Sequence, residues 1–206
     1  MTELYLIRHG RTDANDAGIK QGTINTPNTY LNQTGQQQAQ LLHQYLDLAQ
    51  FTHIYASPLV RTKQTAAILN QTAQLPITYD QRLLEISYGL WDGQANTDLE
   101  RQFPTYFDPV IHDVRSNYAT IAQGETFQHV EQRVADISRE IVQNFPENKI
   151  LIVTHGFTVR SFAMNALHPQ TQGLMEPDNC SVSKLSIDAQ TQAQHLIYYN
   201  RTVAGF

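Results

Sequence analysis

The residues best suited to chemistry lie near the start of the chain, where Arg8-His9-Gly10-Arg11 directly follows the apolar run 4–7. An arginine can grip a phosphoryl group through paired hydrogen bonds, and a neutral imidazole can attack phosphorus. The arrangement recurs in outline where the apolar run 150–153 leads through a threonine into His155-Gly156. Two histidines at such positions indicate a phosphoryl-transfer site in which one imidazole attacks and the other donates hydrogen bonds to phosphoryl oxygens.

These side chains need strands that end beside one another. Short apolar runs rich in β-branched residues predict buried parallel strands over 3–8, 53–56 and 149–154. Two later runs, 181–187 and 195–199, bracket a polar turn and predict an antiparallel pair near the sheet edge. Because ligands bind outside the carboxyl ends of parallel strands, we expect the arginine and both histidines at one edge.

Helices are expected between the strands, over 35–48, from Ser57-Pro58 through residue 69, over about 125–145, and from Gly156 onward. Serine can cap a helix and proline is favoured at its first position. This start places Arg61 in the first turn, at the same rim as Arg8. Strand and helix alternation predicts an α/β sandwich.

The 206 residues fit one domain, which we expect to span 1–206. The stretch 94–123 is less regular, and we interpret it as a mainly helical insertion that caps the active site. Its aromatic residues Tyr106, Phe107 and Tyr118 could cover the site or pack the insertion down, and packing is the favoured interpretation.

The net charge of -5 argues against nucleic acid and anionic membranes as partners, because both require a basic face.

A single cysteine, Cys180, excludes an internal disulfide and fits a reducing compartment. We therefore expect a cytoplasmic protein with a small phosphorylated substrate. The sequence does not indicate an oligomeric state. The six histidines other than His9 and His155 show no paired metal-ligand spacing.

A leaving alkoxide needs a proton, and Glu85 within the apolar segment 83–89 is the preferred donor. Burial there disfavours the charged carboxylate and favours an acid that carries its proton. Asp92 is the competing candidate. Arg133 and Arg160 are expected to lie within helices and to pair with carboxylates, so both are left out of the site.

The chain resembles the histidine phosphatase superfamily, in its phosphoglycerate mutase-like branch. Spaced blocks in the family order carry the resemblance over most of the chain: 6–12 with Asn15, Gln21-Gly22, Gly35 with Gln38-Ala39, 56–59 with Arg61 and 64–66, Glu85 with Gly89 and Trp91, Gly124-Glu125, and 153–156. The resemblance implies a three-layer α/β/α sandwich around a mostly parallel sheet with one antiparallel strand. It also implies metal-independent chemistry.

By the same resemblance, His9 of the Arg-His-Gly motif is the nucleophile that becomes phosphohistidine. Arg8, Arg61 and His155 complete the phosphate pocket, and Glu85 is the proton donor. Further residues match positions that touch phosphate or substrate in relatives: Asn15, Gln21, Gly22, Tyr88 and Gly156.

Three functions are compatible with these residues: a phosphatase, a phosphoglycerate mutase, and a phospho-ligand-binding module without turnover. The binding module is the least supported of the three, since the nucleophile, the arginines that would bind phosphate and the acid are all present. A mutase needs further cations, yet 94–123 offers only Arg101 and Arg115, and Phe157 stands where mutases usually have asparagine. We therefore expect a phosphomonoesterase that needs no cofactor; 2,3-bisphosphoglycerate would be required only by a mutase.

Three departures from the family pattern leave the substrate open. Arg11 stands where glutamate is common, and Asn25 replaces a frequent aspartate. The loop 27–31 is longer than usual and borders the pocket in relatives, so Tyr30 is a candidate substrate contact.

Overall fold

The computed structural model describes residues 1–169 and 173–203, and a six-stranded sheet runs through its centre. In spatial order the strands are β3 (Ile77–Tyr79), β2 (His53–Ala56), β6 (Lys149–Thr154), β1 (Thr2–Arg8), β7 (Val182–Ile187) and β8 (Gln194–Arg201). The first four are mutually parallel, while β7 pairs antiparallel with both β1 and β8. Within the described sheet, β7 alone therefore runs against the other strands, as predicted.

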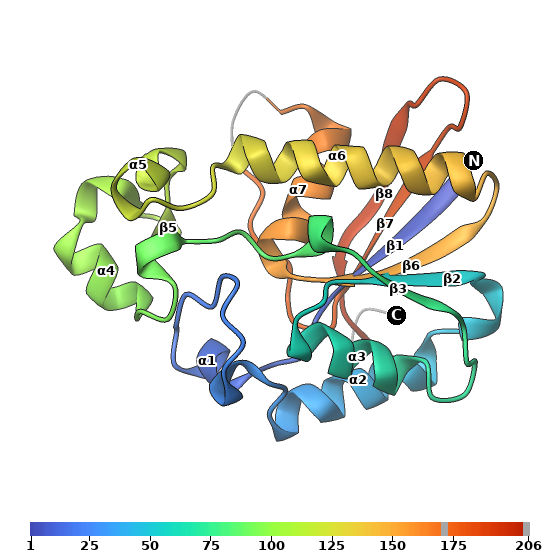
Figure 1. The fold of residues 1–206 in the computed structure, drawn as a ribbon, viewed down its shortest axis with the longest axis horizontal. Helices are drawn as coiled ribbons and strands as arrows, with labels where there is room; N and C mark the ends of the chain where they lie inside the picture. The colour runs from blue at the N-terminus through green and yellow to red at the C-terminus, as the bar shows by residue number, and fades with distance from the viewer. Residues whose placement is uncertain (170–172, 204–206) are drawn as a thin grey trace.

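Helices cover both faces of this sheet (Figure 1). On one face lie α2 (Gln33–Tyr45) and α3 (Val60–Leu69), and on the other α6 (Phe127–Asn144) and α7 (Gly156–Leu167). Successive side chains of β1 point to opposite faces of the sheet, which explains the two layers. Leu4 and Leu6 join the core beneath α6 and α7, whereas Tyr5 and Ile7 join the core beneath α2 and α3. The predicted three-layer α/β/α sandwich is confirmed.

The stretch 94–123 lies to the left in Figure 1, on the side toward which β1 runs. It holds α4 (Asn96–Gln102), a two-stranded sheet of β4 (Phe107–Asp108) and β5 (Asp113–Val114), and α5 (Ala119–Ala122). Tyr106, Phe107 and Tyr118 all contact the indole ring of Trp91. These rings pack the segment onto the body, as expected, rather than covering a ligand.

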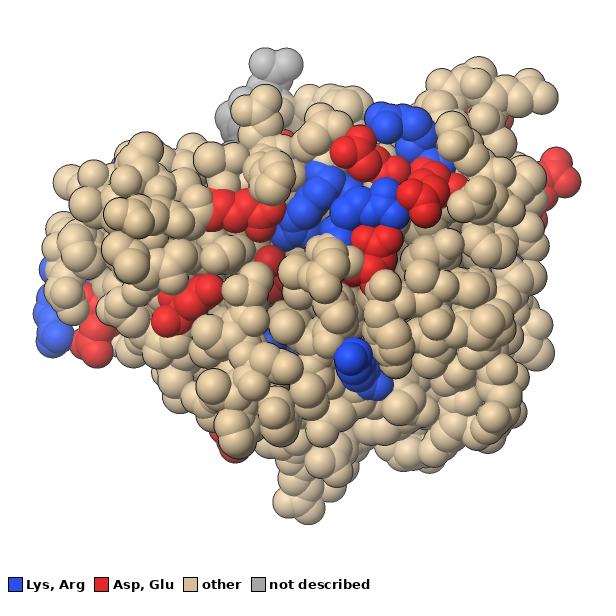
Figure 2. Space-filling model, in the orientation of Figure 1, with Lys and Arg blue, Asp and Glu red and all other residues tan. Residues whose placement is uncertain are grey.

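The longest helix, α6, shows how sequence sets the layers. Thr126 caps it by accepting a hydrogen bond from the amide of His129. Its apolar stripe of Val130, Val134 and Ile137 is fully buried against the sheet, and such residues each contribute about 1.5–3 kcal/mol. The opposite side is polar, and Figure 2 shows Lys, Arg, Asp and Glu side chains gathered over this helix.

Two local predictions differ from the structure. The helix expected from Ser57-Pro58 begins at Val60, and its cap residue Leu59 offers no side-chain acceptor. The strand β3 was not predicted, because its residues are half-buried or exposed and lack a continuous apolar pattern. Short helices complete the described chain: α1 (Asp13–Asp16) and 3-10 turns at Pro27–Thr29, Leu48–Gln50, Gln81–Leu83, Gly89–Trp91, Pro104–Tyr106 and Ser116–Tyr118.

Candidate active site

Two neighbouring strands deliver the paired histidines. β1 ends at Arg8 and β6 ends at Thr154, so His9 and His155 each follow directly after a strand. The amide of His9 donates to the carbonyl of Thr154 at 2.9 Å, which continues the parallel ladder beyond the strands. Both imidazoles are buried, and their ring centroids lie 5.3 Å apart at an interplanar angle of 65°. Residues separated by most of the chain thus form one site.

The imidazole of His9 is held in one tautomer. Its Nδ1 lies 2.7 Å from the carbonyl oxygen of Gly10, an acceptor, so Nδ1 carries the proton and Nε2 keeps its lone pair. Burial lowers the pKa of His9 well below 6.5, and the nearby charges of Arg61 and Arg8 lower it further. His9 is therefore a neutral imidazole at physiological pH, the form that a nucleophile requires.

The guanidinium of Arg61 supports the second histidine and a loop at once. Its Nε donates to Nδ1 of His155 at 3.2 Å, and its terminal nitrogens donate to the carbonyls of Gly22 and Ile24. The opposite ring nitrogen, Nε2, lies 2.7 Å from the hydroxyl of Ser57. Burial lowers the pKa of Arg61 to about 10, which leaves it cationic at neutral pH.

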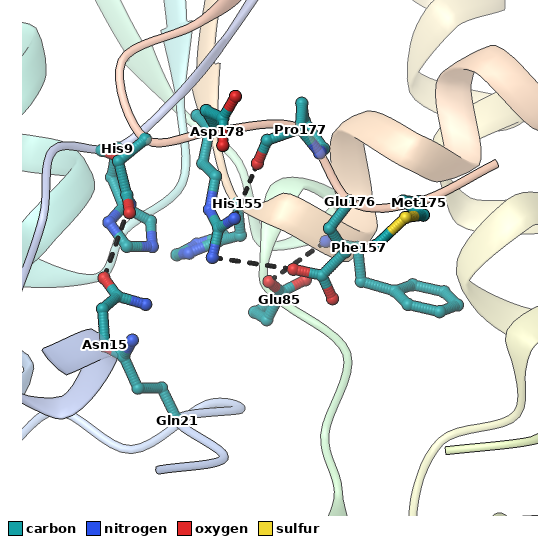
Figure 3. A network of polar contacts seen from close by, with 12 residues as sticks. His9, Asn15, Gln21, Glu85, His155, Phe157, Met175, Glu176, Pro177 and Asp178 are labelled. Carbon is teal, nitrogen blue, oxygen red and sulfur yellow. Dashed lines mark hydrogen bonds and ion pairs between the residues drawn. The ribbon is translucent and has the colours of Figure 1, made fainter. Parts of the chain in front are cut away.

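A small cavity of about 120 Å³ opens beside His9. Eight of the predicted site residues line it: Arg8, His9, Asn15, Gln21, Gly22, Arg61, Glu85 and Tyr88. His155 is fully buried beside His9, and Gly156 begins α7, where an added Cβ would collide with the Glu176 carboxylate. Figure 3 shows His9 and Asn15 on one side of this network and Glu85 on the other.

Glu85 is buried but not in the apolar setting that the sequence suggested. Its carboxylate accepts hydrogen bonds from the amides of Ile86, Phe157 and Thr158 at 3.0–3.3 Å, and from the Thr158 hydroxyl. Phe157 and Thr158 lie in the first turn of α7, so the Glu85 carboxylate accepts hydrogen bonds from amides that have no partner within the helix. Leu83 and Ile86, close to Glu85 in sequence, lie in the core, while Glu85 itself lines the cavity.

The competing acid, Asp92, does not line the small cavity. It accepts hydrogen bonds from the amide of Tyr88 at 2.9 Å and from the amide and hydroxyl of Thr23 at 3.4–3.5 Å. Burial raises its pKa. Asp92 thus joins two loops of the site wall, and Gly22 must lack a side chain because a Cβ there would overlap that carboxylate.

Three charged residues of the cavity wall were missed by the sequence reasoning: Lys20, Asp113 and Glu176. Lys20 pairs with Asp113 and also lies over the ring of Tyr88. The Glu176 carboxylate lies 3.6 Å from Nη2 of Arg8, while Nη1 donates to the carbonyl of Pro177 (Figure 3). Burial raises the pKa of Glu176 to about 7, with Arg8 opposing the shift and Glu85 adding to it. No local motif marks these residues.

A large cavity of about 440 Å³ adjoins the small one, and both are lined by Asp113 and Glu176. Its wall also includes Phe127, Phe157 and Arg160. The expectation that Arg133 pairs with a carboxylate is confirmed by its contact with Glu125. The same expectation for Arg160 is wrong, because no ion pair of Arg160 exists among the described residues.

Tyr30 lines neither of these cavities, and its candidate role as a substrate contact finds no support in the geometry. Cys180 is buried, and burial raises its pKa to about 12. Within residues 1–169 and 173–203, no three His, Cys, Asp or Glu side chains gather so that they could hold a metal ion. The same residues include no helix long and apolar enough to cross a membrane.

The fold and site together define an α/β protein with a cavity lined by His9, Arg8 and Arg61 at the carboxyl ends of its parallel strands. The chain belongs to the histidine phosphatase superfamily (branch 1), whose family model matches residues 4–200. The superfamily is one of enzymes, phosphatases and phosphoglycerate mutases among them.

Named relatives include both activities. The chain is 27% identical over 161 residues to phosphoserine phosphatase 1 of Hydrogenobacter thermophilus, covering 78% of this chain and 74% of that protein. It is 27% identical over 187 residues to the probable phosphoglycerate mutase GpmB of Salmonella arizonae, covering 90% and 85%. The crystal structure of the alpha-ribazole phosphatase from Shigella flexneri superposes with a TM-score of 0.77 at 28% identity, covering 96% of each chain.

Proposed function

We propose that this protein is a phosphomonoesterase that acts on a small phosphorylated metabolite through a phosphohistidine at His9. The observation that carries the proposal is the fixed tautomer of His9. Its Nδ1 proton is committed to the carbonyl of Gly10, and the imidazole lines a cavity that also holds the guanidinium groups of Arg8 and Arg61. A neutral nucleophile beside two cations suits attack on a phosphoryl dianion.

The reaction has two balanced steps. The lone pair on Nε2 of His9 forms a bond to phosphorus as the bond between phosphorus and the ester oxygen breaks, and the protonated form of Glu85 gives its proton to the leaving alkoxide. Water then attacks phosphorus, loses a proton to the Glu85 carboxylate, and the bond between phosphorus and nitrogen breaks. Inorganic phosphate leaves, and both His9 and Glu85 return to their starting forms.

The surrounding groups bind the transferred phosphoryl group. Arg8 and Arg61 neutralise its charge, and His155 exchanges its bond with Ser57 for one to a phosphoryl oxygen. Amide and backbone donors near the rim complete the binding site, from Asn15, Gln21, Gly22, Tyr88 and Gly156. We further propose that residues 94–123 form a cap within a single domain, that no cofactor is needed, and that the protein is cytoplasmic.

Glu85 is proposed as the proton donor rather than Asp92. The Glu85 carboxylate lines the small cavity together with His9, whereas that of Asp92 is occupied with Thr23 and Tyr88 outside it. A donor must come within hydrogen-bond reach of the leaving oxygen, which favours the residue in the cavity wall.

Hydrolysis is favoured over mutase activity by the distribution of cations. A mutase must bind a carboxylate and a second phosphate close to the first. The two arginines in 94–123 do not lie together: Arg115 lines the large cavity, whereas Arg101 pairs with Asp98 and lines neither cavity, so they form no paired cationic site. The side chain of Phe157 instead gives the large cavity an apolar wall.

Two assays test the proposal. His9→Ala should abolish release of phosphate from p-nitrophenyl phosphate while its circular dichroism spectrum stays that of the wild type; retained turnover in this variant would refute the mechanism. The wild type should also be given 3-phosphoglycerate with a trace of 2,3-bisphosphoglycerate. Rapid formation of 2-phosphoglycerate with little phosphate release would identify a mutase instead.

A further inference from the structure

The large cavity is placed to receive the alcohol part of the substrate. It shares Asp113 and Glu176 with the small cavity, so a phosphate ester seated against His9 would extend from one cavity into the other. Its volume of about 440 Å³ is within the range of about 300–1,000 Å³ that is typical of small-molecule sites. A three-carbon acid would leave most of this volume unfilled.

The wall nearest α6 and α7 is apolar. The rings of Phe127 and Phe157 pack with centroids 4.5 Å apart, and the side chains of Val114, Leu174 and Met175 extend the same surface. Such a wall favours binding of a hydrocarbon or ring-containing group, because it buries apolar surface; a short polar chain would gain little binding free energy from it.

Arg160 introduces a cation into this apolar wall. Only 6% of its surface is exposed, and its guanidinium lies 4.9 Å from the ring centroid of Phe157 and 5.4 Å from that of Phe127. Nε donates to the carbonyl of Leu174 at 2.6 Å, while the two terminal nitrogens have no hydrogen bond or ion pair with the described residues. The charge of Glu131 acts on Arg160, but the two form no ion pair, so the terminal donors of this buried guanidinium are available to a ligand.

The acidic residues of the same cavity are already engaged. Asp113 pairs with Lys20, and Glu176 lies against Arg8. Asp108 accepts the amides of Val110 and Ile111, and the nearby charge of Arg115 helps to lower its pKa. The anion that complements Arg160 is therefore absent from the cavity wall.

We propose that the substrate is an elongated phosphomonoester whose alcohol part is apolar next to the phosphate and ends in a carboxylate bound by Arg160. This inference rests on the proposed function for the placement of the phosphoryl group against Arg8 and His9. The guanidinium suits the task because its planar fork matches a carboxylate through paired hydrogen bonds.

Binding of phosphonates that cannot be hydrolysed tests the inference without turnover. Calorimetry would compare ω-phosphonoalkanoates of increasing chain length with alkylphosphonates of the same length. In the wild type, the carboxylate should strengthen binding about tenfold at the length that reaches Arg160, equivalent to about 1.4 kcal/mol. Arg160→Gln should lose this gain. Arg139→Gln should keep it, because Arg139 is exposed and pairs with Asp136.

Equal affinity of the two series at every chain length in the wild type would overturn the inference, even if Arg160→Gln failed to fold. Phosphate release from p-nitrophenyl phosphate separates this failure from failure of the proposed function. Release without any carboxylate effect would leave the phosphatase standing and remove the role of Arg160. Stronger binding of the carboxylate series without phosphate release would instead support the role of Arg160 and refute the proposed phosphatase activity.

Discussion

Arg61 donates from Nε to Nδ1 of His155 at 3.2 Å, and this contact ties the second histidine of the site to the loop that closes it. The other guanidinium nitrogens donate to the carbonyls of Gly22 and Ile24. One buried cation therefore orients an imidazole, fixes a loop and supplies positive charge to the small cavity. Its planar fork makes all three contacts possible.

Arg61→Lys should impair both structure and activity, because an ammonium group cannot make these contacts together. We expect a loss of about 1.5–3 kcal/mol in the free energy of unfolding, from hydrogen bonds to a charged group. Urea titration would measure it, and kcat/KM for p-nitrophenyl phosphate should fall more than tenfold. Arg101→Lys is the matched control, since Arg101 is exposed and pairs with exposed Asp98. Equal behaviour of the two variants would contradict the role of Arg61.

The two active-site histidines should remain neutral as the solution becomes mildly acidic. Burial, with the charge of Arg61 second, lowers the pKa values of His9 and His155 well below 6.5. The unfolded chain binds more protons than the folded one below pH 6.5, so the stability these residues give is present above it and is lost as pH falls. NMR titration of the imidazole carbons should show both rings still neutral at pH 6.5; protonation of either ring near that pH would contradict this.

Glu85→Gln should slow hydrolysis of esters according to their leaving groups. An alkyl phosphate needs a proton on its departing oxygen, whereas p-nitrophenolate leaves without one. We therefore expect kcat to fall by about 10²–10⁴ for an alkyl phosphate and far less for p-nitrophenyl phosphate. Asp92→Asn serves as the comparison variant, because that carboxylate binds Thr23 and Tyr88 instead. If Asp92→Asn showed the leaving-group dependence and Glu85→Gln did not, the assignment would be reversed.

Glu176 should make activity depend on pH near neutrality. Its pKa of about 7, raised first by burial, means that the carboxylate gains its charge as pH rises through that value. The charged form attracts Arg8 and repels a phosphate dianion, so kcat/KM of the wild type should fall across this range. The ratio of kcat/KM for Glu176→Gln to that for the wild type should therefore rise with pH. Glu140→Gln, which removes a surface partner of Arg82, should give a constant ratio; a constant ratio for Glu176→Gln as well would exclude this role.

The sheet and its main helices could be predicted because their residues carry the pattern themselves. The runs that became β1, β2 and β6 are continuous and apolar, and the stripe of α6 repeats at helical spacing. The positions of Arg8, His9 and His155 at strand ends predicted that they lie at one edge, and the structure brings them together there.

The remainder depends on contacts between distant residues, which no local pattern encodes. Ser57 was expected to cap a helix, yet its hydroxyl contacts His155, which is 98 positions away in the chain. Glu85 was expected among apolar neighbours, but it satisfies amides of α7. Arg160 resembles any helical arginine in sequence, and only the cavity shows that its terminal nitrogens lack an anion among the described residues.

The central claim is that His9 becomes phosphorylated during turnover. Incubation of the protein with a labelled phosphomonoester, followed by rapid quenching in base and peptide mass spectrometry, tests it directly. We expect a phosphoryl group on His9 in the wild type, stable in base and labile in acid, and none in His9→Ala. Steady release of phosphate without such an adduct, or an adduct on another residue, would contradict the mechanism.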